Sequence, residues 1–378
     1  MAPTEGKSRK PANTAFKQQR LKAWQPILTP KTVLPTLFIV GIIFAPLGGL
    51  LLYASNTVSE IEIDYTDCAD QPAEFGPMPS NLVKISFASN NGQSDSPQWR
   101  ATDVAYNDIP TKRCEIKYNI PAELKGPVYM YYRLTNFYQN HRRYVKSFDA
   151  KQLQGDAVSA ATLEAGNCKP LATIDGKPIY PCGLIANSMF NDTIYEPRLI
   201  NATGPNTETP INFTSVGIAW PSDRQKYGPT KYNASDVVPP PNWQNRFPGG
   251  AYNETNILTV TDEAFQVWMR TAGLPDFRKL YAKTGESFEA GPYQIDIDLL
   301  FPVKVYGGRK SIVFSTVSFL GGKNPFLGVA YVAVGILCVI LGSIFTAKHL
   351  LKPRKLGDHT KLSWNQNSKN SKGSGGGQ

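Results

Sequence analysis

The sequence predicts a membrane protein of the α+β class, in which two transmembrane helices flank a large β-rich segment with a few helices. Two apolar runs without charged residues, Val33–Tyr53 and Phe326–Ala347, are the first observation. At about 1.5 Å per helical residue, each can cross a hydrocarbon core about 30 Å thick. The second observation is the alternation of apolar and polar residues between these runs, which is typical of β-strands with one buried face.

The first apolar run, Val33–Tyr53, could also be a cleaved signal peptide. The apolar core of a signal peptide is shorter, lies nearer the N-terminus and precedes a small-residue cleavage site. The run is longer than such a core and follows a polar stretch. We therefore predict an uncleaved membrane anchor.

Both apolar runs carry small residues that share one helix face. In the last run these are Gly328, Gly335 and Gly342. In the first run they are Gly41, Ala45 and Gly48. Small residues let transmembrane helices approach closely. The glycine face of the last run can therefore pack on the first run or on a partner protein, and the sequence leaves both arrangements open.

The chain of 378 residues has a net charge of +10, and its excess lysine and arginine cluster in the two tails beside the apolar runs. This is the positive-inside pattern of a membrane protein rather than a basic face for nucleic acid. We therefore expect cytosolic tails and a lumenal or extracellular segment between the helices. The predicted organisation is residues 1–32 as a cytosolic arm, 33–53 as a span, 54–325 as an ectodomain, 326–347 as a span and 348–378 as a cytosolic tail.

The glycosylation sequons support the same topology. N-x-Ser/Thr sequons occur at Asn191, Asn201, Asn212, Asn233 and Asn253, all between the spans. Single sequons arise by chance, but their confinement to one segment favours a lumenal location.

Cysteine usage also indicates an oxidising compartment. The ectodomain contains Cys68, Cys114, Cys168 and Cys182, which allow three disulfide connectivities. We favour Cys68–Cys114 and Cys168–Cys182, because neighbouring pairs close shorter loops. A zinc site is disfavoured, since there is no C-x-x-C and His141 is the only ectodomain histidine.

Several ectodomain segments have clear secondary-structure patterns. Strands are predicted where β-branched and aromatic residues alternate or concentrate, at Val83–Phe87, Tyr129–Tyr138, Ile295–Leu299 and Ser311–Phe319. One helix is predicted over Thr261–Ala272, with Thr261 as its cap and Gly273 and Pro275 behind it.

No motif predicts catalysis, a cofactor or a metal. The stretch AKTGES resembles the phosphorylation motif of P-type ATPases, but Ala282 occupies the position of the nucleophilic carboxylate. The chain has no phosphate-binding loop and no nucleophile elbow. His141, beside Arg142 and Arg143, is poorly suited to general base work. Glu60, Glu62 and Asp64 alternate outside the first span and are expected to be surface charges.

The absence of charge from both spans argues against a transport path within this chain, because pumps and transporters place ionisable groups in the membrane. These features favour an accessory or receptor-like subunit. A two-span ligand-gated channel subunit is the alternative, but Thr36 and Ser343 are almost the only polar residues available to line a pore. An extracellular hydrolase is a third possibility, disfavoured by the missing catalytic motifs.

Several long blocks, in this order, closely resemble the ligand-effect-modulator (CDC-fifty) family. They are TAFKQQRLKAWQPILTP, LTNFYQNHRRYVKS, PCGLIANSMFNDT, GIAWPSDRQKY, DEAFQVWMRTAGLPDFRKLY and KSIVFSTVSFLGGKNPFLGVAYVAVG, within residues 14–350. The N-terminal block is similar to fungal members. These proteins are the non-catalytic β-subunits of type IV P-type ATPases, the phospholipid flippases.

The resemblance implies a fold, a partner and a location. The fold is an antiparallel β-sandwich ectodomain that is glycosylated, is disulfide-bonded between neighbouring cysteines and lies between two helices with cytosolic termini. The partner is the catalytic ATPase, bound about 1:1, which carries the ATP chemistry and moves phospholipids such as phosphatidylserine to the cytosolic leaflet. The β-subunit acts like a chaperone for folding and exit from the endoplasmic reticulum. The complex is expected there, in Golgi or endosomal membranes, or in the plasma membrane.

Three contacts with the partner are predicted: the ectodomain covers the partner's lumenal loops, the two spans pack beside its membrane domain, and the N-terminal arm reaches its cytosolic surface. The basic and aromatic N-terminal arm offers Phe16, Arg20 and Trp24 beside the first span. The glycine face, if it is not used within the chain, offers Gly328, Gly335 and Gly342.

Overall fold

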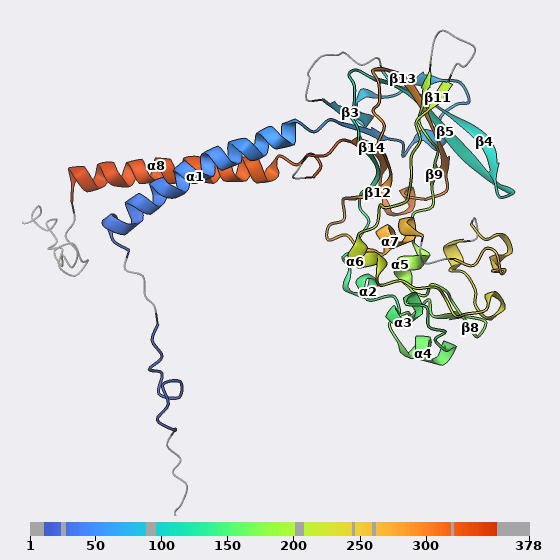
Figure 1. Ribbon diagram of the computed structural model, residues 1–378, viewed down its shortest axis with the longest axis horizontal. Helices are drawn as coiled ribbons and strands as arrows, with labels where there is room; N and C mark the ends of the chain where they lie inside the picture. The colour runs from blue at the N-terminus through green and yellow to red at the C-terminus, as the bar shows by residue number, and fades with distance from the viewer. Residues whose placement is uncertain are drawn as a thin grey trace, which may run out of the picture. The chain divides into compact units, whose positions relative to one another are not determined.

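The computed structural model describes residues 11–23, 28–87, 96–200, 208–243, 246–258, 262–318 and 321–353. The chain divides into two compact units (Figure 1). One unit is Tyr53–Pro325, and the other joins Met1–Leu52 to Phe326–Gln378. Both predicted spans form long helices in the second unit.

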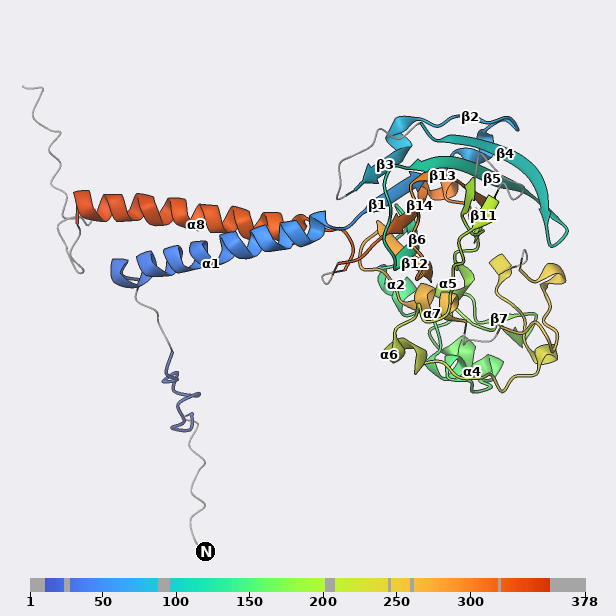
Figure 2. The ribbon, with the colours of Figure 1, turned by 45° about the horizontal axis from the view of Figure 1, so that its top comes forward.

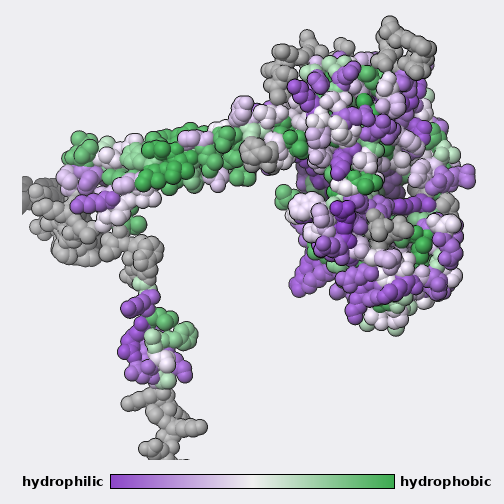
Figure 3. Space-filling model, in the orientation of Figure 1, coloured by the Kyte–Doolittle hydropathy of each residue, from purple (hydrophilic) through white to green (hydrophobic). Residues whose placement is uncertain are grey.

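The two long helices are α1 (Pro30–Asn56) and α8 (Phe326–Leu351). Each is long and apolar enough to cross a membrane, and Figure 3 shows an apolar surface along much of the pair. Both extend beyond the predicted apolar runs. Helical structure continues into flanking polar residues, such as Lys348 and His349 in the last turn of α8, because backbone hydrogen bonding does not depend on side-chain polarity.

The unit Tyr53–Pro325 is built on two antiparallel sheets. The five-stranded sheet has the order β12 (Phe277–Thr284), β6 (Val128–Leu134), β14 (Lys310–Ser315), β1 (Glu60–Asp64) and β3 (Val83–Ser86). The seven-stranded sheet has the order β11 (Glu208–Pro210), β10 (Arg198–Ile200), β13 (Gly291–Leu299), β5 (Ile109–Ile120), β4 (Gln98–Tyr106) and β2 (Gly76–Pro77), with β9 (Thr193–Ile194) also paired to β13. A separate small hairpin joins β7 (Thr173–Ile174) to β8 (Lys177–Pro178).

Short helices connect and cover the strands, and in Figures 1 and 2 they gather beyond one end of the sheets. The α-helices are α2 (Arg142–Val145), α3 (Ala150–Leu153), α4 (Ala160–Ala165), α5 (Leu184–Asn187), α6 (Pro221–Arg224) and α7 (Glu263–Met269). The 3-10 turns are η1 (Cys68–Asp70), η2 (Ser80–Leu82), η3 (Ala234–Asp236), η4 (Pro241–Trp243), η5 (Pro248–Gly250) and η6 (Lys304–Tyr306).

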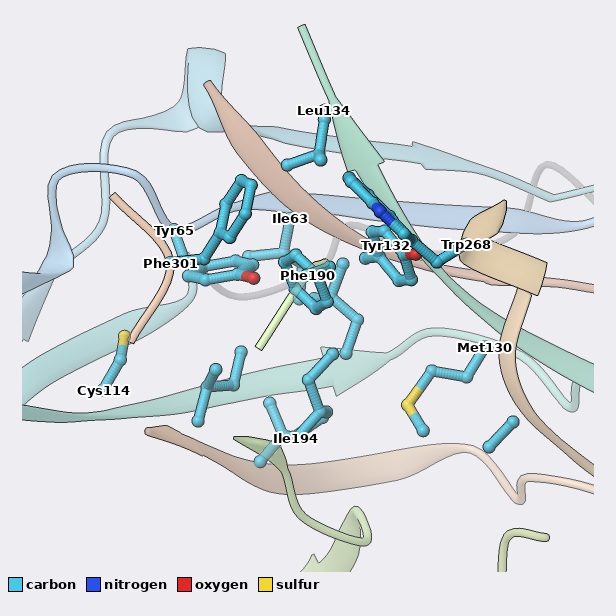
Figure 4. Close-up of a cluster of buried hydrophobic side chains, with 14 of the residues drawn as sticks. Ile63, Tyr65, Cys114, Met130, Tyr132, Leu134, Phe190, Ile194, Trp268 and Phe301 are labelled. Atoms are coloured by element: carbon cyan, nitrogen blue, oxygen red, sulfur yellow. The ribbon is translucent and has the colours of Figure 1, made fainter. Parts of the chain in front are cut away.

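The two sheets share one apolar core, as expected for a sandwich. Ile61 and Ile63 of β1, with Phe314 of β14, belong to the same buried cluster as Ile116 of β5 and Ile295 of β13. Aromatic rings extend the cluster to the short helices. Figure 4 shows Tyr132 of β6 beside Phe190 and Trp268; the rings of Tyr132 and Phe190 stack with centroids 3.9 Å apart.

A buried ion pair joins the two sheets. The Nζ atom of Lys310, at the start of β14, donates to Oδ2 of Asp192 at 2.7 Å and to the carbonyl oxygen of Phe301 at 2.8 Å. Oδ1 of Asp192 accepts from the backbone N–H groups of Leu300 and Phe301, directly after β13. The Tyr65 hydroxyl, directly after β1, donates to Oδ2 at 2.9 Å. The Asp192 side chain is fully buried, so this set of contacts replaces its hydration.

The predicted disulfides are present, and each lies in a different cluster of buried apolar residues. Cys68–Cys114 links η1 to β5 with a Cα–Cα distance of 5.8 Å, and therefore connects the end of β1 to the other sheet. Cys168–Cys182 has a Cα–Cα distance of 5.6 Å. It belongs to a small satellite core with Leu163 and Ile179.

Strands are present at all four predicted places, but two end earlier than predicted. β6 ends at Leu134 rather than Tyr138, and β14 ends at Ser315, while Phe319 lies outside the described residues. The predicted helix is also shorter than expected. Helix α7 spans Glu263–Met269 rather than Thr261–Ala272. Thr261 lies outside the described residues, and the side chain of Asp262 is the cap, accepting from the N–H of Ala264. The helix ends early because Arg270 adopts an extended conformation, with φ −74° and ψ 96°.

Replacing Lys310 with methionine should destabilise the unit Tyr53–Pro325 by about 3–5 kcal/mol, because it leaves the Asp192 carboxylate buried without its cation. Chemical denaturation monitored by tryptophan fluorescence measures the change. The matched control is Lys231→Met, because Lys231 pairs with Asp156 at 2.8 Å on an exposed surface. Its expected cost is under about 1 kcal/mol, and equal costs for both variants would contradict the assigned role of Lys310.

Candidate partner-binding surfaces

The glycine face of α8 packs on α1. A Cβ atom at Gly335 would lie 2.9 Å from the backbone nitrogen of Ala45, and one at Gly328 would lie 2.7 Å from Cγ of Leu52. A Cβ at Gly342 would come within 3.2 Å of the ring of Phe38. The structure thus has the first of the two arrangements that the sequence left open, with small residues at the contact. The glycine face is therefore not free for a partner, and contacts within the membrane would involve the other faces of α1 and α8.

The outward faces of the helix pair are aliphatic and at least half exposed. They carry Ile39, Ile42, Ile43 and Leu50 on α1, and Val329, Ile336, Leu337 and Ile344 on α8. The polar hydroxyls bond within their own helices: Thr36 donates to the carbonyl of Thr32, and Ser343 to the carbonyl of Val339, both at 2.8 Å. These faces suit lipid or an apolar partner surface, whereas a pore lining needs polar groups that are free to meet water.

The N-terminal arm presents two of its predicted contact residues to solvent. Phe16 is 76% exposed, and Arg20 is also exposed, with its guanidinium on the side chain of Asn13. Trp24 lies outside the described residues. An exposed phenylalanine beside a cation can contribute to binding when both are buried by a partner.

The alternating carboxylates of β1 belong to ion pairs. Glu60 pairs with Arg278 at 2.6 Å, and Glu62 with Arg133 at 2.5 Å. Asp64 pairs with Arg309 at 2.5 Å. Asp64 is buried, and Glu60 and Glu62 are partly buried, so the expectation that these carboxylates are solvated surface charges was wrong. Each carboxylate has its own arginine, and their arrangement gives no pair of acids for glycoside hydrolysis.

The other candidate chemical groups also have structural roles. Ala282 is buried in β12, so the resemblance of AKTGES to a phosphorylation loop is coincidental. His141 is the N-cap of α2, accepting at Nδ1 from the N–H of Arg143. In the part of the chain that the structure describes, no group of histidine, cysteine and carboxylate side chains could hold a metal ion.

Lys279 is a buried cation that the sequence analysis missed. Its ammonium group donates to the carbonyl oxygens of Val267 at 2.9 Å and Trp268 at 2.8 Å, and to that of Arg270. These carbonyls belong to the C-terminal end of α7, which attracts cations. Burial, and then the charge of Arg270, lowers the pKa of Lys279 to about 7. Its partners are backbone atoms that folding brings together, so no side-chain motif signals this site.

The sequon asparagines differ in their exposure to solvent. Asn212, Asn233 and Asn253 are exposed, and Asn191 is half-buried. Asn201 lies outside the described residues. The exposed positions leave room for a carbohydrate chain on the surface.

Comparison with known proteins identifies the family. The sequence profile of the LEM3 (ligand-effect modulator 3) family, also called the CDC50 family, matches residues 51–355. The chain is 44% identical over 363 residues to the phospholipid-transporting ATPase accessory subunit CRF1 of Saccharomyces cerevisiae, covering 95% of this chain and 90% of the relative. The chain belongs to the CDC50 family.

Two further relatives show how widely this CDC50-family sequence is shared. The chain is 42% identical over 376 residues to the phospholipid-transporting ATPase accessory subunit CDC50 of Chaetomium thermophilum, covering 95% of this chain and 92% of the relative. It is 41% identical over 352 residues to cell cycle control protein 50A of Mus musculus, covering 89% of this chain and 88% of that protein. The similarity spans both helices and the sheets of this CDC50-family member.

Gly335→Leu should destabilise the isolated subunit by at least about 1–3 kcal/mol, because the added side chain overpacks the contact with α1. Thermal unfolding in detergent measures this effect. Gly49→Leu is the matched control on α1, since a Cβ at Gly49 would meet no heavy atom within 4 Å. An isolated Gly335→Leu subunit with unchanged stability would contradict the packing of α8 on α1.

Lys279 should make stability depend on pH. The pKa of a lysine in the unfolded chain is about 10.4, so between pH 7 and that value the unfolded state binds more protons. Raising the pH from 7 to 9 should therefore stabilise the folded chain, by up to about 1.4 kcal/mol per pH unit from this group. The free energy of unfolding is measured between pH 7 and pH 9 for the wild type and for Lys279→Met. The difference between the two slopes against pH gives the contribution of Lys279. Lys226→Met, at an exposed lysine, serves as the control, and equal slopes for wild type and Lys279→Met would exclude the effect.

Proposed function

We propose that this chain is the accessory subunit of a phospholipid-transporting ATPase. The observation that carries the proposal is the nearly full-length similarity to subunits bearing that name, at 44% identity over 95% of the chain and 90% of the relative. The catalytic ATPase is the partner and performs the ATP chemistry. The accessory subunit itself is non-catalytic and acts by binding the ATPase.

The surface of one unit and the core of the other support a binding role. The helix pair exposes aliphatic faces with no charged residue in the stretch Val33–Tyr53 or Phe326–Ala347. The sheet unit is stabilised by its own core and two disulfides. Such a subunit can support the folding of a membrane partner, and it shifts the partner's conformational equilibrium if its contacts are stronger in one state.

We further propose a topology, a stoichiometry and a location. The positive tails are cytosolic, and the disulfide-bonded unit Tyr53–Pro325 lies in the lumen or outside the cell, where its sequons are glycosylated. One subunit binds one ATPase. Binding allows the complex to leave the endoplasmic reticulum for Golgi, endosomal or plasma membranes. The exposed Phe16 and Arg20, together with Trp24, contact the cytosolic surface of the ATPase.

Affinity purification of the full-length chain from a eukaryotic host tests the function. The expected result is a roughly 1:1 complex with a large P-type ATPase that transports phospholipid. The same purification with residues 1–25 deleted should give slower phosphoenzyme turnover, because the arm contacts are lost.

Two outcomes of this purification would count against the proposal. A homotrimer without ATPase would favour the channel alternative. Unchanged assembly, turnover and transport after the deletion would remove only the role of the arm. Lys17→Ala, an exposed cation beside Phe16, is the control for a mere change in charge.

A further inference from the structure

A surface cavity of about 360 Å³ is lined by the end of α7, by β12 and by the loop that precedes α6. Its walls include Trp220, Arg270, Arg278 and Tyr131. Pockets that bind small molecules are typically about 300–1,000 Å³, so this cavity has room for a small polar molecule.

The wall of this cavity carries more positive than negative charge. The basic residues that line it are Arg270, Arg278 and Lys279. Asp223 is the one carboxylate among the described lining residues. It already has a cation of its own, because Nζ of Lys226 donates to its Oδ1 atom at 2.7 Å. The excess of positive charge favours an anionic ligand.

The guanidinium of Arg270 is held in place without using all its hydrogen-bond donors. It stacks on Trp220, with Cζ 3.7 Å from the centroid of the ring. Its one hydrogen bond to a described residue is long, at 3.5 Å from Nη1 to Oδ2 of Asp223. The side chain of Arg270 is half exposed and Trp220 is 60% exposed, so a molecule in the cavity can reach both. A stacked guanidinium with unused N–H groups is preorganised to bind a phosphate or a carboxylate.

Arg278 and Tyr131 supply further donors. Nη1 of Arg278 donates to Oε2 of Glu60 at 2.6 Å, while Nε and Nη2 have no acceptor among the described residues. The Tyr131 hydroxyl also has no acceptor there. Burial raises the pKa of Tyr131, so its hydroxyl keeps the proton and remains a donor. Both side chains are partly exposed, unlike the fully enclosed polar groups of the core.

Arg278 also contacts both linkers that lead into the membrane helices. Glu60 follows Asn56, where α1 ends, by four residues. In the other linker, a Cβ atom at Gly322 would lie 2.7 Å from Nη2 of Arg278, and α8 begins four residues later at Phe326. Four residues span at most about 14 Å. The anions that this wall can meet therefore include phospholipid headgroups at the membrane surface.

We propose that this cavity binds the phosphate group of an anionic phospholipid headgroup. The guanidinium groups of Arg270 and Arg278 contact the phosphate oxygens, and the Tyr131 hydroxyl donates a further hydrogen bond. The indole of Trp220 packs on the glycerol, and the acyl chains stay outside the cavity. The inference rests on the membrane location proposed above, but all the contacts come from this chain, so the site can be tested without the ATPase.

Titration of the full-length chain in a neutral detergent with dihexanoyl phosphatidylserine tests the site, and calorimetry gives the Kd. Saturable binding at one site is expected. Arg270→Gln should raise the Kd at least about tenfold, because hydrogen bonds between charged groups are lost. Arg142→Gln is the matched control, since it removes an exposed cation elsewhere on the ectodomain, and it should leave the Kd within about twofold. Equal weakening by both variants would indicate general attraction between charges and overturn the site.

Tyr131→Phe separates binding from folding. It removes only a hydroxyl that has no partner among the described residues, so the melting temperature of the ligand-free chain should not change. The Kd should rise about three- to tenfold, because one hydrogen bond to the lipid is lost. This variant decides the matter if Arg270→Gln does not fold. An unchanged Kd in folded Tyr131→Phe would contradict binding in this cavity.

Two further ligands identify the source of the anion. Dihexanoyl phosphatidylcholine should bind at least about threefold more weakly than the serine lipid, because its headgroup has no net charge. Inorganic phosphate should compete with the serine lipid but bind more weakly, because it lacks the glycerol that packs on Trp220. Equal affinity for the two lipids overturns the preference for an anionic headgroup. Phosphate that binds as tightly as the serine lipid overturns the lipid site in favour of a free-anion site.

Failure of this inference is distinguishable from failure of the proposed function. Co-purification of the wild-type and Arg270→Gln chains with the ATPase is measured in parallel. If the wild type binds no lipid and Arg270→Gln loses the ATPase, the cavity binds a protein partner and the lipid site is overturned. A wild-type chain that binds the lipid but never co-purifies with an ATPase overturns the proposed function and supports the site.

Discussion

The buried ion pair between Lys310 and Asp192 is the interaction on which the sheet unit most depends. It ties the start of β14 in one sheet to the chain after β13 in the other. Removing two charges from water is costly, and their attraction offsets this only with further hydrogen bonds. Tyr65, Leu300 and Phe301 supply them. Because Asp192 follows Asn191 directly, the ion pair also fixes the backbone beside this sequon.

The helix pair is held together by packing rather than by charge. It contains no charged contact at its centre, and the two helices meet through backbone and small side chains at Gly335 and Ala45. In lipid, close van der Waals packing replaces the hydrophobic effect as the cause of association. With the glycine face used internally, aliphatic side chains remain outside, which suits a subunit that acts through contact with a membrane partner rather than through chemistry of its own.

Local sequence patterns predicted much of the fold. Composition, alternation and loop length predicted the two spans, strands at Val83–Phe87 and Ile295–Leu299, and the favoured disulfide partners. The candidate site was less predictable. No sequence pattern singled out Lys279, yet its ammonium group binds the carbonyl groups at the end of α7. Asp192 looks like the variable position of a sequon. Their partners are backbone atoms or side chains far away in the chain, and no local pattern encodes such contacts.

The sequence by itself determined that the chain has two membrane helices around a disulfide-bonded β-rich unit, because helix length, period and charge are local properties. Collinear blocks also placed it in a family of ATPase accessory subunits. Only the tertiary structure decided which surface the glycine face contacts, and which charges are buried. It alone distinguished Asn191, with its enclosed oxygen, from the exposed sequons. Burial depends on how distant segments pack together, so asparagines of the same N-x-Ser/Thr motif can lie in very different surroundings.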